Sequence, residues 1–251
     1  MSRTIPILAY HKVDEEEHSQ FWVSTKEFDM HMAALQGHGF SSVRLEDLWL
    51  SAHQGVTLPE KPVCITFDDG YENFSTKAFP ILLRYGFIAT VFLPTDFIGD
   101  SSRHLNIWDR SAEERSFPAA HLLWSEVVEL HTQGIEFGAH TKTHPDLGAL
   151  FVNDPQRATA EILDSRKAIE SRLPCPTGFF SFPYKSSNTD LETVLRDAGF
   201  HGAVTMNGRR FDLSEGNWFC MDRIPVFSGA PGLPASSVNR EFLSIIGETS
   251  R

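Results

Sequence analysis

Cysteine is scarce in this chain of 251 residues, which has only Cys64, Cys175 and Cys220. The number is odd and the spacing matches no zinc-binding pattern, so the sequence supports neither a disulfide framework nor a cysteine-based metal site. We expect the three thiols to be reduced and to lie in or near the core.

Long hydrophobic runs are also absent. No stretch approaches the roughly 20 apolar residues that cross a bilayer, which argues against a transmembrane segment. The opening residues, MSRTIPILAYHKV, lack both the apolar core of about 7–15 residues and the small-residue cleavage site of a secretory signal. We therefore expect a cytoplasmic protein if this N-terminus is native, and an exported one if a signal peptide was removed.

Positive charge is in deficit. Lysine and arginine number 22 against 33 aspartates and glutamates, which gives a formal net charge of -11. Because nucleic-acid-binding surfaces are basic, this balance argues against a nucleic-acid partner.

Gly/Ser-rich linkers, low-complexity tracts and internal repeats are absent as well, so we expect residues 1–251 to form one domain. The sequence does not indicate the oligomeric state.

The chain does contain short β-rich runs that alternate with amphipathic helical stretches, a pattern typical of βα units around a parallel sheet. Strands are predicted at 5–10, 62–67, 87–93, 134–138, 178–182, 200–205 and 221–226. Helices are predicted at 25–37, 45–52, 73–85, 122–133, 155–173, 188–198 and 236–246. These elements predict an α/β barrel of about seven strands. The segment 95–121 is long and irregular, which is typical of a functional loop.

The run ITFDDG, residues 65–70, ends a buried strand in two adjacent carboxylates, Asp68 and Asp69. Two like charges side by side cost free energy, and they cost more where low-dielectric walls are close. In βα folds the active-site groups lie at the C-terminal ends of strands, which favours a functional role for the pair. The alternative is a solvated turn in which one carboxylate caps the following helix.

A second polar cluster, GAHTKTHPD, follows the apolar run 135–137. His140 and His144 are four residues apart, a spacing that turns both imidazoles to one side of a helical turn and suits a shared metal. The spacing alone is weak, because helices acquire it by chance, and Thr141 stands where the zinc-protease motif needs glutamate. A divalent metal would explain both clusters: one carboxylate is neutralised by coordination, and the other takes a proton from water.

These two motifs, followed by Phe182-Pro183-Tyr184, resemble the polysaccharide deacetylase family (carbohydrate esterase family 4, the chitooligosaccharide-deacetylase homology domain). The similarity extends over residues 5–226, and the motifs stand in the family's order. Two further stretches, Ala9-Tyr10-His11 and RIPV at 223–226, resemble the branch that acts on extracellular poly-N-acetylglucosamine or lipid-linked sugars.

The resemblance implies a distorted (β/α) barrel with about seven strands in a single domain. It also implies a metal-dependent hydrolase that removes acetyl groups from an N-acetylated sugar in a polysaccharide, oligosaccharide or lipid-linked glycan. Asp68 would be the general base, and Asp69, His140 and His144 would hold a divalent ion. Zinc is the first expectation, with cobalt, nickel or iron as alternatives. The backbone N–H of Tyr184 would contact the substrate by binding its oxyanion.

Three positions depart from the family pattern. Ser181 stands where many members carry an arginine that bonds the catalytic aspartate. Lys185 stands in place of glycine, and no histidine follows Phe227 to serve as the general acid. Because an amine leaves poorly unless it is protonated, we assign the acid to His11, at the end of the first strand. The alternative for His11 is a strand-end histidine bonded to a backbone carbonyl.

Arg223 lies near the start of the last predicted strand, 221–226. We expect it to replace the missing arginine beside Asp68 and to take part in substrate binding, on the grounds of its place in the barrel alone. The other histidines share no spacing and are expected mostly at the surface: His18, His31, His38, His53, His104, His121, His131 and His201.

Two other interpretations remain open. The same barrel and metal site would also suit the hydrolysis of a small non-sugar amide. A related barrel without catalytic activity would bind glycan and not turn it over.

Overall fold

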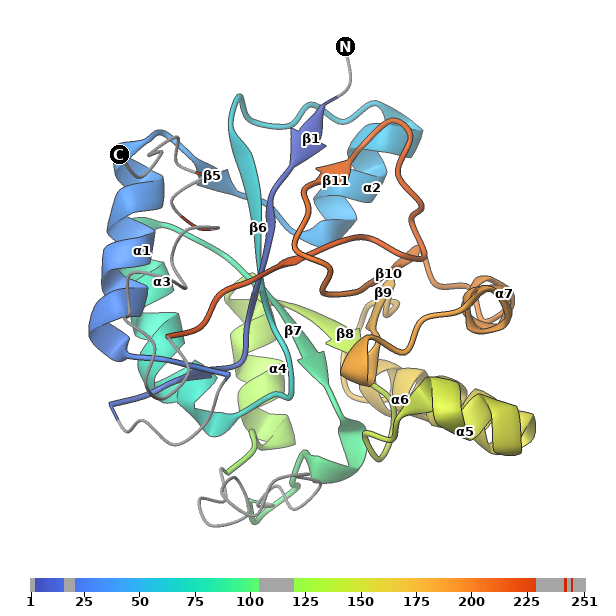
Figure 1. Ribbon diagram of the computed structural model, residues 1–251. Helices are drawn as coiled ribbons and strands as arrows, with labels where there is room; N and C mark the ends of the chain where they lie inside the picture. Colours follow the sequence, from blue (N-terminus) through green and yellow to red (C-terminus); the bar gives the residue numbers. More distant parts are fainter. Residues whose placement is uncertain (1–2, 16–20, 104–119, 229–241, 243–244, 246–251) are drawn as a thin grey trace.

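The computed structural model describes residues 3–15, 21–103 and 120–228, together with Phe242 and Ile245. The strands of its central sheet are β2 (Ile7–Tyr10), β5 (Ser41–Ser42), β6 (Pro62–Phe67), β7 (Thr90–Leu93), β8 (Glu136–Ala139), β9 (Phe179–Ser181), β10 (Gly202–Val204) and β12 (Ile224–Pro225). The order is β10-β9-β8-β7-β6-β2-β12, with β5 beside β6, and all neighbours are parallel. The sheet curls into the distorted single-domain barrel that was predicted (Figure 1).

Each of the seven predicted strands coincides with a strand of this sheet. The first is broken at Pro6, which has no N–H to donate, and its opening residues form a separate strand, β1 (Thr4–Ile5). That strand pairs antiparallel with β11 (Phe211–Asp212). A further two-stranded pair, β3 (Lys12–Val13) with β4 (Trp22–Val23), lies after the end of β2.

Helices surround the curled sheet (Figure 1). They are α1 (Thr25–Gly37), α2 (Leu45–Gln54), the π-helix η1 (Phe74–Ala78), α3 (Phe79–Tyr85), the 3₁₀ turn η2 (Thr95–Phe97), α4 (Trp124–Thr132), α5 (Leu147–Asn153), α6 (Pro155–Glu170), the 3₁₀ turn η4 (Pro183–Lys185) and α7 (Thr189–Asp197). Among these described helices, none is long and apolar enough to cross a membrane.

The helix predictions differ from the structure at two places, and one predicted helix is not tested. Helix α5 was not predicted. The next helix, α6, begins at Pro155 as predicted, because Asp154 caps it and accepts from Arg157 N at 3.0 Å. The predicted helix 73–85 opens with the π-helix η1. The predicted helix 236–246 lies outside the described residues, except that Phe242 and Ile245 are buried.

Alternation along β6 sorts its side chains between two cores. Ile65 and Phe67 pack in the outer core with side chains of α1 and α3. Cys64 packs in the inner core with residues from other strands, among them Ile7, Phe92, Phe179 and Met221. Thr66 shares the inward side with Cys64, and the next inward position along the chain is Asp68. The strand therefore carries a carboxylate into the interior of the barrel.

One segment joins the two ends of the curled sheet. Met221 N bonds Ala203 O at 2.8 Å and Arg223 N bonds Thr205 O at 3.1 Å, which attaches the segment to β10. Immediately afterwards β12 pairs with β2. Because one short stretch contacts both ends of the sheet, the side chain of Arg223 lies in the barrel interior between them and is fully buried, whereas the next residue, Ile224, packs in the outer core.

At the end of the barrel where the strands begin, Glu136, the first residue of β8, attaches α2 to the sheet. Its carboxylate accepts from Leu45 N at 3.0 Å and from Glu46 N at 3.1 Å, in the first turn of α2, and Thr90 donates to it as well. Burial raises the pKa of Glu136 to about 7, although these hydrogen bonds favour the charged form.

The raised pKa predicts a pH-dependent stability. The folded state holds the Glu136 proton more tightly than the unfolded chain, whose pKa is the ordinary 4.5. The stabilisation is therefore complete below pH 4.5 and is lost as the pH rises through 7. We expect Glu136→Gln to lack this loss, so its melting temperature should gain on wild type as the pH rises through that window. Glu129→Gln, at an exposed position of α4, is the control; parallel curves for Glu136→Gln and wild type would contradict the prediction.

Candidate metal centre and active site

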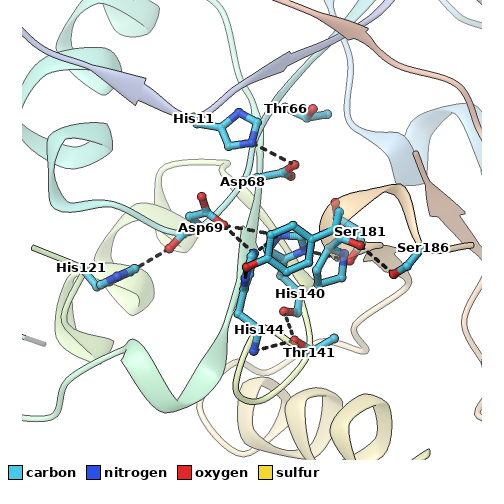
Figure 2. Close-up of polar contacts among 12 residues, drawn as sticks. His11, Thr66, Asp68, Asp69, His121, His140, Thr141, His144, Ser181 and Ser186 are labelled. Carbon is cyan, nitrogen blue, oxygen red and sulfur yellow. Dashed lines mark hydrogen bonds and ion pairs between the residues drawn. The ribbon is translucent and has the colours of Figure 1, made fainter. Parts of the chain in front are cut away.

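Polar side chains from three strand ends meet at one mouth of the barrel (Figure 2). Asp68 and Asp69 follow β6, His140 and His144 follow β8, and His11 follows β2. The carboxyl ends of parallel strands lie at the same edge of a sheet, so residues far apart in the sequence converge there. The structure thus brings together all five of these predicted site residues.

Asp69, His140 and His144 form a compact triad. Asp69 Oδ1 lies 3.4 Å from His140 Nε2 and 3.2 Å from His144 Nε2, and the two imidazole nitrogens are 3.2 Å apart. A tetrahedral zinc ion with bonds of about 2.0–2.1 Å separates its nitrogen and oxygen ligands by about 3.3–3.4 Å. Asp69 Oδ1 is buried and has no hydrogen-bond partner beyond these two nitrogens. The triad therefore fits a divalent metal.

The other imidazole nitrogens are engaged in ways that suit metal ligands. His140 Nδ1 lies 2.7 Å from Ser181 O, and a carbonyl can only accept, so Nδ1 carries the proton and Nε2 is left with its lone pair. His144 Nδ1 lies 3.2 Å from the hydroxyl of Tyr184. Contacts of this kind fix the tautomer and the orientation of ligating histidines.

Burial would raise the pKa of Asp69, but the hydrogen bonds of His140 and His144 outweigh it and hold that pKa well below its usual range. The carboxylate is therefore ionised, as coordination requires. Three protein ligands are the number typical of catalytic zinc sites, whereas structural sites have four.

The backbone around the triad is strained. Among the described residues, five other than glycine have positive φ: Asp69, Thr141, His144, Tyr184 and Lys185. All five lie after the ends of β6, β8 or β9, and such conformations cost on the order of 1–3 kcal/mol each. Lys185, at the position where the family usually has glycine, adopts φ of 61°.

The two histidines do not lie on a helical turn as their spacing suggested. Residues 140–144 form an irregular loop after β8, in which Thr141 has φ of 65° and His144 has φ of 58°. The prediction that helical periodicity brings the imidazoles together is therefore wrong, because left-handed residues interrupt any helix.

Asp68 is held by Arg223. The guanidinium donates from Nη1 to Asp68 Oδ1 at 2.8 Å and from Nη2 to Oδ2 at 2.6 Å. It also donates to Thr66 Oγ1 at 3.0 Å, to Ser181 Oγ at 2.9 Å and to Thr205 O at 3.1 Å. Arg223, from the segment that joins the two ends of the sheet, thus stands where the resemblance led us to expect an arginine from position 181, and Ser181 is one of its contacts.

Burial alone would raise the pKa of Asp68, but the charge of Arg223, with a smaller effect of His140, lowers it to about 2. Arg223 is fully buried, and its guanidinium nitrogens all donate to Asp68, Thr66, Ser181 or Thr205. Orientation of Asp68 therefore suits this geometry better than the substrate-binding role that we expected from the sequence.

His11 faces the same carboxylate from the other side. Its Nε2 lies 3.8 Å from Asp68 Oδ2 (Figure 2), and its ring stacks on Phe21 with centroids 4.8 Å apart. Burial lowers the pKa of His11, although the charges of Asp68 and Asp69 oppose that shift. No backbone carbonyl is among the described partners of this imidazole.

Two histidines expected at the surface are buried. His121 is fully buried, and its Nδ1 lies 2.8 Å from the backbone oxygen of Asp69 (Figure 2). His31 is also buried, 3.3 Å from the hydroxyl of Tyr10. Sequence reasoning missed both because their partners lie 52 and 21 residues away and no local spacing marks them. His18 and His104 lie outside the described residues.

Comparison with known families decides the assignment. The family model described as polysaccharide deacetylase matches residues 55–203. The chain belongs to the polysaccharide deacetylase family. It is thereby a hydrolase of the deacetylase type. The matched range includes the ligand triad, Asp68 and Tyr184, whereas His11 and Arg223 lie outside it.

Several curated proteins are similar in sequence to this family member. YxkH of Bacillus subtilis (strain 168), whose name includes polysaccharide deacetylase, is 28% identical over 228 residues, covering 91% of this chain and 73% of that protein. The poly-beta-1,6-N-acetyl-D-glucosamine N-deacetylase of Escherichia coli (strain K12) is 29% identical over 243 residues, covering 87% and 35%. The chain therefore spans about a third of the Escherichia coli protein's length.

Solved structures of other proteins share the fold. The Streptococcus pyogenes deacetylase PplD, in complex with acetate, superposes with a TM-score of 0.78 at 22% identity, covering 96% of this chain and 99% of that one. IcaB from Ammonifex degensii gives a TM-score of 0.75 at 20% identity, covering 98% and 96%. At these identities the likeness supports the fold.

The buried Asp68–Arg223 pair predicts a large coupling in stability. Arg223→Met leaves a buried carboxylate without its partner, so we expect a loss of about 3–5 kcal/mol in the free energy of unfolding, measured in urea. Asp68→Asn combined with Arg223→Met should lose less than the sum of the single variants. Arg84→Met, which removes an exposed ion pair with Asp29, is the control and should cost about 0–1 kcal/mol. Additive effects of the two buried substitutions would contradict the prediction.

Proposed function

We propose that this chain is a metal-dependent deacetylase that hydrolyses the acetamido group of an N-acetylglucosamine polymer. The observation that carries the proposal is the pairing of a metal-fitting triad with a second carboxylate, Asp68, held beside it by Arg223. We also propose that residues 1–251 act as one catalytic domain, because His11 and Arg223 come from its two ends.

Sequence relatives support the substrate class. Proteins named poly-beta-1,6-N-acetyl-D-glucosamine N-deacetylase occur in Escherichia coli (strain K12) and Staphylococcus epidermidis, the latter 23% identical over 192 residues, covering 76% of this chain and 63% of that protein. The named reaction removes acetyl from nitrogen, and we propose the same for this chain. A β-1,6-linked glucosamine polymer is the substrate to test first.

Asp69, His140 and His144 would hold the metal ion. We propose zinc, with cobalt, nickel or iron as alternatives, since a set of one carboxylate and two imidazoles accepts each of them. A divalent ion bound there would polarise the acetyl carbonyl and lower the pKa of a water molecule.

Asp68 is proposed to take the proton from the attacking water. Arg223 fixes the plane of its carboxylate by two hydrogen bonds, and each carboxylate oxygen retains a lone pair that can accept from water. The low pKa of Asp68, about 2, means that it orients the water better than it retains the proton. His11, 3.8 Å from Asp68 Oδ2, is a nearby group to which that proton can pass.

His11 is also proposed to protonate the departing amine. The carbon–nitrogen bond of the amide breaks only when the nitrogen leaves as a neutral amine, so a proton donor is required on this side. The backbone N–H of Tyr184 is proposed to donate to the oxyanion that forms on the acetyl carbonyl. The products are acetate and a sugar with a free amine, and the water proton ends on the nitrogen.

The proposal is tested by measuring metal content and acetate release on the same samples. We expect about one metal per chain in wild type, from the single triad described. Asp69→Ala should lose metal and acetate release together. Asp68→Asn should keep the metal and lose turnover, because it removes the base and no ligand. Asp164→Asn, an exposed position on α6, is the control. Protein that takes up no metal after reconstitution would overturn the proposal, and metal without acetate release would redirect it to small amides.

The role of His11 is tested by changing the leaving group. An amide needs protonation of its nitrogen, whereas 4-nitrophenyl acetate releases a stable phenolate without it. We expect His11→Ala to slow acetate release from β-1,6-linked N-acetylglucosamine oligomers by about 10²–10⁴-fold. The rate on the aryl ester should change much less. Equal losses on both substrates, or no loss on the oligomer, would rule out His11 as the acid, and metal content serves as the control for an intact site.

A further inference from the structure

The loop between the two histidine ligands needs an external restraint. A helix would hold imidazoles at this spacing by its own hydrogen bonds, but residues 140–144 are not helical. Thr141 is β-branched, and positive φ is a genuine outlier for such a residue. Without a restraint this loop would relax towards ordinary backbone angles, and the two Nε2 atoms would separate.

Part of the restraint lies within the loop. Thr141 is fully buried, and its hydroxyl accepts from His144 N at 3.0 Å and donates to His140 O at 2.5 Å. These two bonds tie the backbones of both ligands to one side chain (Figure 2). They do not connect the loop to the rest of the protein.

Two kinds of contact connect the loop to the rest of the protein. Backbone bonds hold two of its carbonyls, Thr95 N donating to Thr141 O at 3.2 Å and Asp96 N to Lys142 O at 3.0 Å. The side chain that holds its N–H groups is Glu161, on α6. Its Oε2 accepts from Lys142 N at 3.0 Å and from Thr143 N at 2.7 Å, and its Oε1 accepts from Thr143 Oγ1 at 2.7 Å. Consecutive backbone N–H groups that point at one anion form a nest, an arrangement that left-handed residues make possible. Here the anion is a side chain of the same protein.

Glu161 is an unusual residue to find in this position. It is 5% exposed, on the face of α6 that also buries Ala158, Ile162 and Ser165. Among the residues that the structure describes, no lysine, arginine or histidine forms an ion pair with it. A buried carboxylate costs free energy unless hydrogen bonds compensate, and the bonds available to it are those of the ligand loop.

We propose that Glu161 is a positioning residue of the metal centre, whose carboxylate holds the loop between His140 and His144 in the form that directs both imidazoles at Asp69. The inference rests on the proposed metal-dependent function. The main contribution is geometric: the glutamate oxygens fix two neighbouring N–H groups and one hydroxyl, and thereby the path of the backbone from one ligand to the other.

The geometry distinguishes two substitutions. Glutamine at 161 can keep all three contacts, since Oε1 can accept from both N–H groups and Nε2 can donate to the threonine hydroxyl, which also accepts. Alanine removes all of them. We therefore expect Glu161→Ala to weaken metal binding by about 10–100-fold, as outer partners of metal ligands do, and Glu161→Gln to stay close to wild type.

The control is Glu170→Ala on the same helix. Glu170 accepts a backbone N–H from another loop, Thr177 N at 3.1 Å, and does not contact the ligand loop. We expect its removal to lower the melting temperature and leave metal affinity unchanged. Any loss that Glu161→Ala shares with Glu170→Ala is then a general loss of stability.

The first measurement is the zinc dissociation constant of wild type and the three variants, by competition with a coloured chelator, with the visible spectrum of the cobalt-substituted proteins beside it. The cobalt spectrum reports ligand geometry directly, so Glu161→Ala should alter it and Glu161→Gln should not. Equal zinc affinity and an unchanged cobalt spectrum in Glu161→Ala would overturn the proposal.

A second measurement needs no metal. Amide hydrogen exchange of Lys142 and Thr143 in the metal-free proteins should be faster in Glu161→Ala than in wild type, and unchanged in Glu170→Ala. Unchanged exchange at both amides would overturn the proposal for Glu161 even in a protein that binds no metal. Failure of wild type to bind zinc would instead count against the proposed function, so the two failures are distinguishable.

Discussion

Much of this structure depends on how it accommodates two neighbouring carboxylates in a buried position. Asp68 and Asp69 are 2% and 6% exposed, and their mutual repulsion would be severe if both faced the same surroundings. They do not, because Asp69 has φ of 72° and the chain turns between them. Asp68 continues the inward alternation of β6 and meets a guanidinium, whereas Asp69 turns towards two imidazoles.

The partners of the two carboxylates come from different parts of the barrel. The partner of Asp68 comes from the segment that joins the two ends of the sheet, so closure of the barrel and ionisation of this carboxylate are coupled. Gly138, on β8, leaves room for the ring of Phe92 on the neighbouring strand β7, because a Cβ at position 138 would lie 2.5 Å from that ring. The Arg223 guanidinium lies over the same ring, 5.5 Å from its centroid. The arginine thus rests between a carboxylate and an aromatic ring, with no access to water.

Carboxylates that accept consecutive backbone N–H groups occur at both ends of the barrel. Glu136 accepts two from the start of α2, and Glu161 accepts two from the loop after β8. The first pair belongs to a regular helix, where N–H groups are unsatisfied in any case. The second belongs to a strained loop, where the same device supports backbone angles that would otherwise be unfavourable. The contact of Glu136 attaches a regular helix to the sheet, whereas the contact of Glu161 stabilises the backbone conformation of the loop after β8.

Much of the fold could be predicted from the sequence, because strand and helix patterns are local. All seven predicted strands coincide with strands of the sheet, whereas the two-residue strands β3, β4, β5 and β11 were not predicted, and the Asp68–Asp69 pair was recognised at the end of one strand. The local conformation of the HTKTH loop was predicted wrongly, since its spacing matches a helix and its left-handed residues carry no sequence signal. Glu161, His121 and the Tyr184 hydroxyl could not be predicted, because each acts on a segment remote in the sequence. Arg223 was chosen from its place in the barrel, after the arginine expected at position 181 was found to be missing.

The position of Arg223 in the chain has a consequence for how the protein forms. During synthesis the ribosome releases Asp68 and the two histidines long before Arg223, and the sheet cannot join its ends until that late segment arrives. Until then Asp68 has no counterion and is better left in water than buried. The interior of the barrel should therefore stay hydrated in the nascent chain until that segment pairs, and its pairing should be the step that removes water from Asp68.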